Sequence, residues 1–122
     1  MPSEITYEMS FAASKGGAAI DSGTISDTID MSGSNMATFT QAVGTSNEAI
    51  GFPSDVSGSL HVVVSNLDQT NYVELFYDNA NTYLMSRLNG GESCSLRRVA
   101  STALFARANT AACQVQVWAC QA

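Results

Sequence analysis

The stretch from Ser57 to Asp78, SGSLHVVVSNLDQTNYVELFYD, decides the fold of this chain. In its first part, the apolar residues Leu60, Val62 and Val64 occupy every second position, which places them on one face of a β-strand. The polar run NLDQTN follows with side chains that favour turns, and Tyr72–Tyr77 has the composition of the next strand. A strand, a tight turn and a second strand in this order predict antiparallel β-structure.

The rest of the chain repeats this pattern of short strands and polar turns. Gly and Ser interrupt it so often that no segment carries the apolar stripe of an amphipathic helix. A chain of 122 residues has the usual size of one domain. We therefore predict an all-β protein, an antiparallel β-sandwich or barrel, with further strands at Ile5–Phe11, Thr24–Met31, Met36–Ala42, Glu48–Phe52, Tyr83–Leu88, Ser93–Val99, Ala103–Ala108 and Ala112–Cys120.

Two of these strands allow their faces to be assigned. Alternation in the last strand predicts a core face made of Cys113, Val115, Val117 and Ala119. In the strand Tyr72–Tyr77, the same argument places Val73, Leu75 and Tyr77 on one face and Tyr72, Glu74 and Phe76 on the other. The second face is mixed in polarity, so we expect it to meet solvent or a partner.

The N-terminal part differs in composition from the rest. Residues 1–30 contain few large apolar side chains around the Ala-, Gly- and Ser-rich run AASKGGAAIDSG, which predicts a flexible link. Such a segment gains too little from burial to offset its ordering entropy unless it docks on another surface. We expect residues 1–30 to form an N-terminal arm or peripheral strands and residues 31–122 to form the sandwich.

Charge and hydropathy exclude several classes of partner. The formal net charge is -6, and the chain has only five basic residues, so we expect no direct binding to nucleic acid. The N-terminal sequence MPSEITYEMSF lacks the basic start and apolar segment of a secretion signal. No run approaches the roughly 20 apolar residues of a membrane span, so we expect no membrane insertion.

The sequence offers little for catalysis. It contains one histidine, His61, within a predicted strand, and no nearby pair of groups that would activate a nucleophile. The turns NLDQTN and DNAN are rich in oxygen atoms but do not match a calcium loop, and SKGG and NGGE are too short for a phosphate loop. We expect each Gly-Gly pair to supply positive φ at a turn. The prediction is a protein that is not an enzyme, with no catalytic residues, no cofactor and no metal.

Three cysteines are present, Cys94, Cys113 and Cys120. Seven residues separate Cys113 from Cys120 in one predicted strand, so these two lie about 23 Å apart and cannot form a disulfide. Cys94 could face either of them from a neighbouring strand. The simplest interpretation is three reduced thiols in a protein made in the cytosol.

An interaction surface is the remaining possibility. Aromatic residues and arginine dominate protein interfaces, and several of them lie on predicted faces away from the core or near turns. Aromatic residues also fill sandwich cores, so each candidate has this second interpretation. The candidate interface residues are Tyr72, Phe76, Tyr83, Arg87, Arg107 and Trp118.

The segment from Leu60 to Ala119, LHVVVSNLDQTNYVELFYDNANTYLMSRLNGGESCSLRRVASTALFARANTAACQVQVWA, resembles small structural proteins of tailed bacteriophages. The shared pattern is a hydrophobic strand, an N-L-D-x-T-N-Y-V-E-L turn and strand, a short Asn/Asp turn, an R-L-x-x-G-E turn, a basic-apolar strand, an aromatic-Ala-R/K-A strand and a closing hydrophobic strand. Proteins with this pattern include capsid cement, or decoration, proteins. The resemblance implies a β-sandwich, often of the jelly-roll type, and association as trimers.

The resemblance also implies a function. We expect a non-enzymatic homotrimer on the outer surface of the phage head, where it would bridge and stabilise major capsid proteins after synthesis in the host cytoplasm. Related sequences occur in tail, neck and fibre components, which is the first alternative. A carbohydrate-binding β-sandwich is the second, because exposed aromatic residues and Asn/Asp groups can bind sugar.

Overall fold

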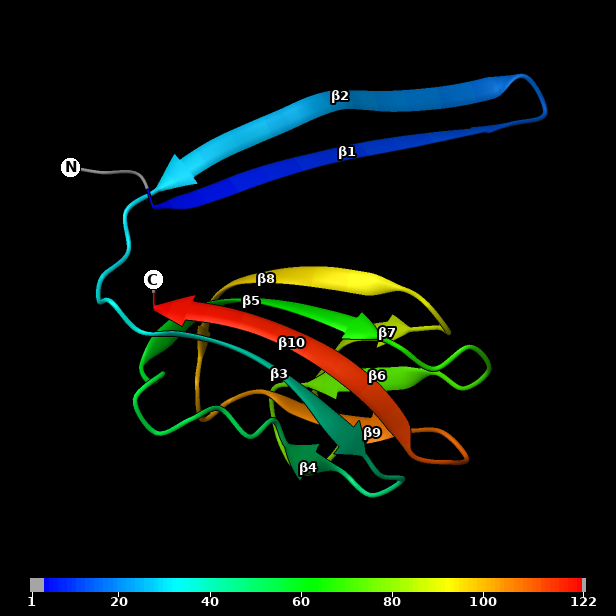
Figure 1. The fold of residues 1–122 in the computed structure, drawn as a ribbon. Helices are drawn as coiled ribbons and strands as arrows, with labels where there is room; N and C mark the ends of the chain where they lie inside the picture. The colour runs from blue at the N-terminus through cyan, green and yellow to red at the C-terminus, as the bar shows by residue number, and fades with distance from the viewer. Residues whose placement is uncertain (1–3, 122) are drawn as a thin grey trace. The chain divides into compact units, whose positions relative to one another are not determined.

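The computed structural model describes residues 4–121. They divide into two compact units, of which the first ends at Ser32 and the second begins at Gly33. All regular structure in the described residues is β-strand, and every strand pair is antiparallel. The prediction of an all-β, antiparallel fold is therefore confirmed. Each unit is described by itself below (Figure 1).

The first unit is one long β-hairpin. Strand β1 (Ile5–Lys15) pairs with β2 (Ala18–Ile29), and Gly16 and Gly17 connect them with φ angles of 59° and 87°. Two residues with positive φ form the tight turn that matches the twist of the strands. The prediction of a flexible link at AASKGGAAIDSG is therefore wrong, because the Gly-Gly pair closes a hairpin whose strands continue through the alanines.

The second unit is a β-sandwich of eight strands. One sheet has the order β3-β10-β5-β8 and the other has the order β4-β9-β6-β7 (Figure 1). The sandwich prediction is confirmed. The strands are β3 (Met36–Val43), β4 (Glu48–Ala49), β5 (Ser59–Asn66), β6 (Val73–Phe76), β7 (Leu84–Leu88), β8 (Ser93–Ala100), β9 (Phe105–Ala108) and β10 (Cys113–Gln121).

Strand pairing in the sandwich is nested. The innermost strands β6 and β7 pair with each other, and outward from them β5 pairs with β8, β4 with β9 and β3 with β10. Apart from the β6–β7 connection, each link between consecutive strands crosses from one sheet to the other. The strands β3 to β10 are thus arranged as one long hairpin that is folded around a single core.

The core lies between the two sheets. The alternation predicted for the strand at Leu60 is confirmed, because Leu60, Val62 and Val64 are fully buried. The predicted core face of the last strand is confirmed as well. The buried cluster also includes residues of both sheets and of the connecting loops, among them Val43, Ile50, Val56, Val73, Leu75, Leu88, Val99, Leu104, Ala106, Ala108, Cys113, Val115, Val117 and Ala119.

Four strands, β4, β6, β7 and β9, are shorter than predicted, and the structure gives the reason for two of them. At Glu48–Phe52, only Glu48–Ala49 pairs with β9, because the backbone N–H of Gly51 donates to the side chain of Gln41 instead. Strand β6 ends at Phe76, so Tyr77 does not continue the core face and is 55% exposed. The chain reverses there, and the N–H of Tyr77 donates to the carbonyl of Tyr83.

The turns NLDQTN and NGGE are joined by one buried side chain, that of Asn66. Its Nδ2 donates to the carbonyls of Asn71 and Leu88 at 2.9 and 3.0 Å, and its Oδ1 accepts from the N–H of Asp68.

A Cβ atom on Gly90 would lie 2.6 Å from the backbone of Gln69. Of the two glycines in NGGE, only Gly91 has positive φ, at 81°, so the expectation for such pairs holds for Gly91 but not for Gly90.

Candidate interaction surface

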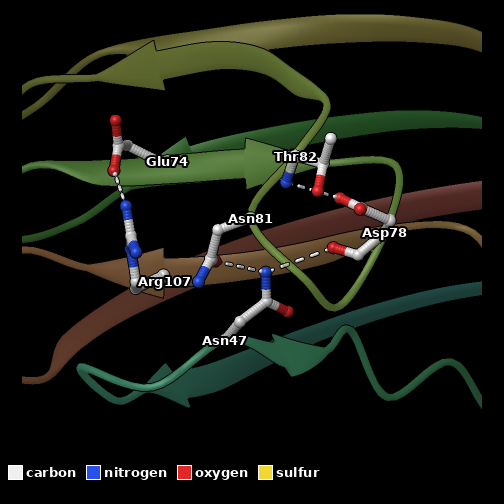
Figure 2. Close-up of polar contacts among 6 residues, drawn as sticks. All are labelled: Asn47, Glu74, Asp78, Asn81, Thr82 and Arg107. Atoms are coloured by element: carbon white, nitrogen blue, oxygen red, sulfur yellow. Dashed lines mark hydrogen bonds and ion pairs between the residues drawn. The ribbon is translucent and has the colours of Figure 1, made fainter.

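The outer face of the β4-β9-β6-β7 sheet brings together three of the predicted interface residues with Glu74. The guanidinium carbon of Arg87 lies 3.6 Å from the centre of the Tyr72 ring. Arg107 Nη2 lies 2.8 Å from Glu74 Oε1 in an ion pair, which Figure 2 shows. Glu74 faces both arginines, Arg87 on one neighbouring strand and Arg107 on the other. The cation–π contact between Arg87 and Tyr72 and the ion pair between Arg107 and Glu74 hold the side chains of this row in place.

Phe76 continues the row but is not part of its exposed surface. The side chain is only 2% exposed, and the guanidinium carbon of Arg107 lies 5.3 Å from the ring centre. The ring therefore serves as packing for Arg107, as the second interpretation of the aromatic candidates allowed.

Beside this row, the loop between β6 and β7 is fixed by short polar side chains. Asp78 Oδ1 accepts from the backbone N–H groups of Thr82 and Tyr83. Asn47, from the loop between β3 and β4, donates through Nδ2 to the carbonyl of Asp78 and to Asn81 Oδ1 (Figure 2). Tyr83 follows this loop and is 63% exposed. The result is a rigid loop that presents an aromatic side chain.

Trp118 lies on the other sheet. It pairs with Thr38 and Val63 on the outer face of β3-β10-β5-β8 and is 44% exposed. The six predicted residues therefore do not form one surface. Met36 is exposed on the same outer face, where it pairs with Cys120, which lies two residues from Trp118 on β10.

A bulge in β8 places two arginines at this outer face. The pairing of β5 with β8 shifts between Leu60 and Val62, so Arg97 and Arg98 lie opposite His61. Arg98 has a φ of 56°, a left-handed conformation that is uncommon for a residue other than glycine. Both arginines are exposed residues. Burial, followed by the charges of Arg98 and Arg97, lowers the pKa of His61 from its usual value.

The hairpin carries a surface that the sequence analysis missed. Cross-strand pairs place Ile5 with Ile29, Tyr7 with Asp27 and Met9 with Ile25 on one face. Phe11 continues the alternation of β1 on that face, and Ile20 joins it through its pair with Ala13. We call this set the arm face; it consists of Ile5, Tyr7, Met9, Phe11, Ile20, Ile25 and Ile29. The alternation in ITYEMSF was the available signal.

The three thiols are free in this structure. Cys113 and Cys120 both lie in β10, so the prediction that they cannot pair with each other is confirmed. Burial raises the pKa of the Cys94, Cys113 and Cys120 thiols. Thiols of this kind are poor nucleophiles near neutral pH.

Residues 4–121 contain neither a metal-binding cluster nor a membrane-spanning helix. No group of three or more His, Cys, Asp or Glu side chains in that range is placed to hold a metal ion. No helix in the same range is long and apolar enough to cross a membrane.

Comparisons of the chain with models of protein families, with curated proteins and with solved structures give no match. Function must therefore be argued from the surfaces described above.

Proposed function

We propose that this chain is a non-enzymatic structural protein of a bacteriophage virion, a capsid cement or decoration protein. It binds as a homotrimer to the outer surface of the head and bridges neighbouring major capsid proteins. The protein is made in the host cytoplasm, and neither nucleic acid nor a membrane is its partner.

The observation that carries this proposal is the N-terminal hairpin. A two-stranded hairpin is marginally stable on its own in water. The arm face nevertheless exposes large apolar side chains, with Phe11 64% exposed and Ile20 62% exposed. Exposed apolar surface of this kind marks a binding site for another protein or a membrane. An ordered arm on a rigid sandwich suits a protein whose work is to hold other subunits.

The strand order of the sandwich supports a jelly-roll assignment. Nested pairing of β3 with β10, β4 with β9, β5 with β8 and β6 with β7 is the pattern of an eight-stranded jelly roll with two Greek keys. Jelly rolls are common in viral capsid proteins, although they also serve as lectins. The fold agrees with the proposal, and the arm adds the argument for assembly.

The stabilisation follows from mass action. A protein that binds the assembled lattice and not the free subunits stabilises the lattice by RT ln(1 + [L]/Kd) for each site. A trimer makes several such contacts at once, so its overall affinity exceeds that of one contact. No bond is made or broken in this mechanism.

The experiment is binding to phage heads that lack this protein. The purified chain should co-sediment with intact heads and raise the temperature at which they release DNA, whereas unassembled major capsid protein should not bind it. Binding to purified tails or necks instead of heads would favour the first alternative, a tail, neck or fibre component.

One observation favours a carbohydrate-binding protein as a second candidate. Tyr77 and Tyr83 are 55% and 63% exposed on either side of the loop that carries Asp78 and Asn81. Aromatic rings beside fixed amide and carboxylate groups could stack on a sugar and bind its hydroxyls. A glycan array separates the two candidates: a specific signal that is lost in Tyr83→Ala would support sugar binding.

A further inference from the structure

We propose that the arm face binds the outer face of the β3-β10-β5-β8 sheet of a second copy, so that copies exchange their N-terminal hairpins. This inference rests on the proposed homotrimer and names the contact that would hold it together. The receiving surface is called the acceptor face and consists of Met36, Thr38, Val63, Arg97, Arg98 and Trp118.

Charge complementarity supports this contact. The described hairpin residues carry a formal charge of −4, from five acidic residues and one lysine: Glu4, Glu8, Asp21, Asp27, Asp30 and Lys15. The four strands of the acceptor sheet contain no Asp or Glu, and their cationic side chains are Arg97 and Arg98. The register places Asp27 and Lys15 on the arm face and places Glu8 and Asp21 on the opposite face, so the attraction to the basic sheet comes from the net charge of the whole hairpin.

The other sheet lacks this complementarity. Its strands contain Glu48 and Glu74 as well as Arg87 and Arg107. The two acidic side chains offset the two arginines, so these strands carry no net charge that would attract an acidic hairpin.

The backbone conformation at Arg98 also supports this contact. Arg98 holds a φ of 56° at the β8 bulge, and bulges commonly re-aim side chains next to functional sites. Held in this way, Arg97 and Arg98 occupy adjacent positions of an edge strand at the acceptor face. The bulge keeps Leu96 and Val99 on the core side of β8 and leaves the two arginines exposed beside each other, an arrangement that suits binding.

Exposed apolar side chains are present on both faces. Met36 and Trp118 are 65% and 44% exposed on the acceptor face, and both lie on adjacent strands of the sheet. On the arm face, Met9 and Ile25 form a cross-strand pair and are 46% and 51% exposed. Contact between the two faces would remove both apolar surfaces from water.

The arm face and the acceptor face are different surfaces, and this difference determines the symmetry of the assembly. A contact between unlike surfaces is heterologous, and such contacts close into a ring when the rotation between copies allows it. A ring of three copies is the assembly that the proposed function requires.

The test uses full-length variants with a matched control. Met9→Glu/Phe11→Glu adds two charges to the arm face. Ser10→Glu/Ser14→Glu adds the same charge to the same strand but on the opposite face of the hairpin. Trp118→Glu alters the acceptor face. Circular dichroism verifies the sandwich in each variant, and light scattering at micromolar concentration gives the mass.

We expect three chains per particle for the unaltered protein and for Ser10→Glu/Ser14→Glu, and one chain for each of the other two variants. Mixing Met9→Glu/Phe11→Glu with Trp118→Glu should restore particles of two chains, because one intact arm then meets one intact acceptor face. This recovery is the decisive result, since a hairpin that folds onto its own sandwich cannot produce it.

Other outcomes overturn the inference. They are a single-chain mass for the unaltered protein, a trimer that persists in Met9→Glu/Phe11→Glu, dissociation of the Ser10→Glu/Ser14→Glu control, and a mixture that stays single-chain. If the arm face binds the capsid lattice instead, Met9→Glu/Phe11→Glu stays trimeric but loses head binding. The proposed function fails separately, if the trimer forms by arm exchange yet does not bind heads.

Discussion

The side-chain amide of Asn66 donates a hydrogen bond to the backbone carbonyl of Leu88 at 3.0 Å, across 22 residues of sequence. Through this contact, the turn that follows β5 holds the end of β7. The same amide also bonds to the carbonyls of Asn71 and Asn89. A single buried side chain therefore fixes two turns at one end of the sandwich.

Asn66→Ala should destabilise the fold by roughly 1 to 3 kcal/mol, because it leaves buried carbonyls without donors. Asn66→Asp should be at least as harmful, since it keeps the shape but turns a carboxylate oxygen toward those carbonyls. The exposed Asn79→Ala is the control and should change little. Urea unfolding followed by tryptophan fluorescence measures the differences, and equal stability of all three variants would contradict the role given to Asn66.

Gly90 should not tolerate a side chain. A Cβ atom there would lie 2.6 Å from the backbone carbonyl group of Gln69, so Gly90→Ala must push the two turns apart. We expect a loss of about 2 kcal/mol in the free energy of unfolding. Gly44→Ala is the matched control, because no atom lies within 4 Å of its added Cβ and its φ is not positive. Thermal unfolding compares the two variants, and the prediction fails if their midpoints agree.

The three thiols should be free and slow to react in the folded protein. Burial raises the pKa of each thiol, which lowers the thiolate fraction at neutral pH. After unfolding in denaturant without reductant, three thiols per chain should react with an aromatic disulfide reagent. A value near one would show that Cys94 is bridged to Cys113 or Cys120.

Deleting residues 1–32 should leave the sandwich folded, because every member of the buried core cluster lies between Val43 and Ala119. The remaining chain should keep its β-sheet circular dichroism and a cooperative thermal transition. Its binding to phage heads should fall sharply, since the arm is lost. A truncated chain that does not fold would show that the hairpin is part of the sandwich core; unchanged head binding would place the clamp elsewhere on the sandwich.

The sandwich was predictable where one strand face meets the core. In β5 and β10, large apolar residues such as Val64 and Val117 occupy every second position, and that signal depends only on local sequence. Strand β6 was predicted one residue too long at its C-terminal end, because Tyr77 fits the alternation but the chain turns there. The position of a strand end depends on the turn that follows it.

The hairpin was not predictable in the same way. Small residues such as Ala13 and Ala19 weaken its alternation, and a Gly-Gly pair is compatible with a flexible link as well as with a tight turn. The side-chain contacts on the outer faces of the sheets could not be predicted from the sequence either. Stacking of Arg87 on Tyr72 and the pairing of Arg107 with Glu74 depend on which strands become neighbours, and β6 and β9 are far apart in sequence.

The proposal that this protein decorates the outside of a phage head is tested most directly by electron cryomicroscopy of heads that lack the protein, imaged before and after the purified chain is added. We expect new density on the outer surface, with threefold symmetry and contacts to more than one major capsid protein. Density on the tail or neck, or heads that look the same with and without the protein, would contradict it.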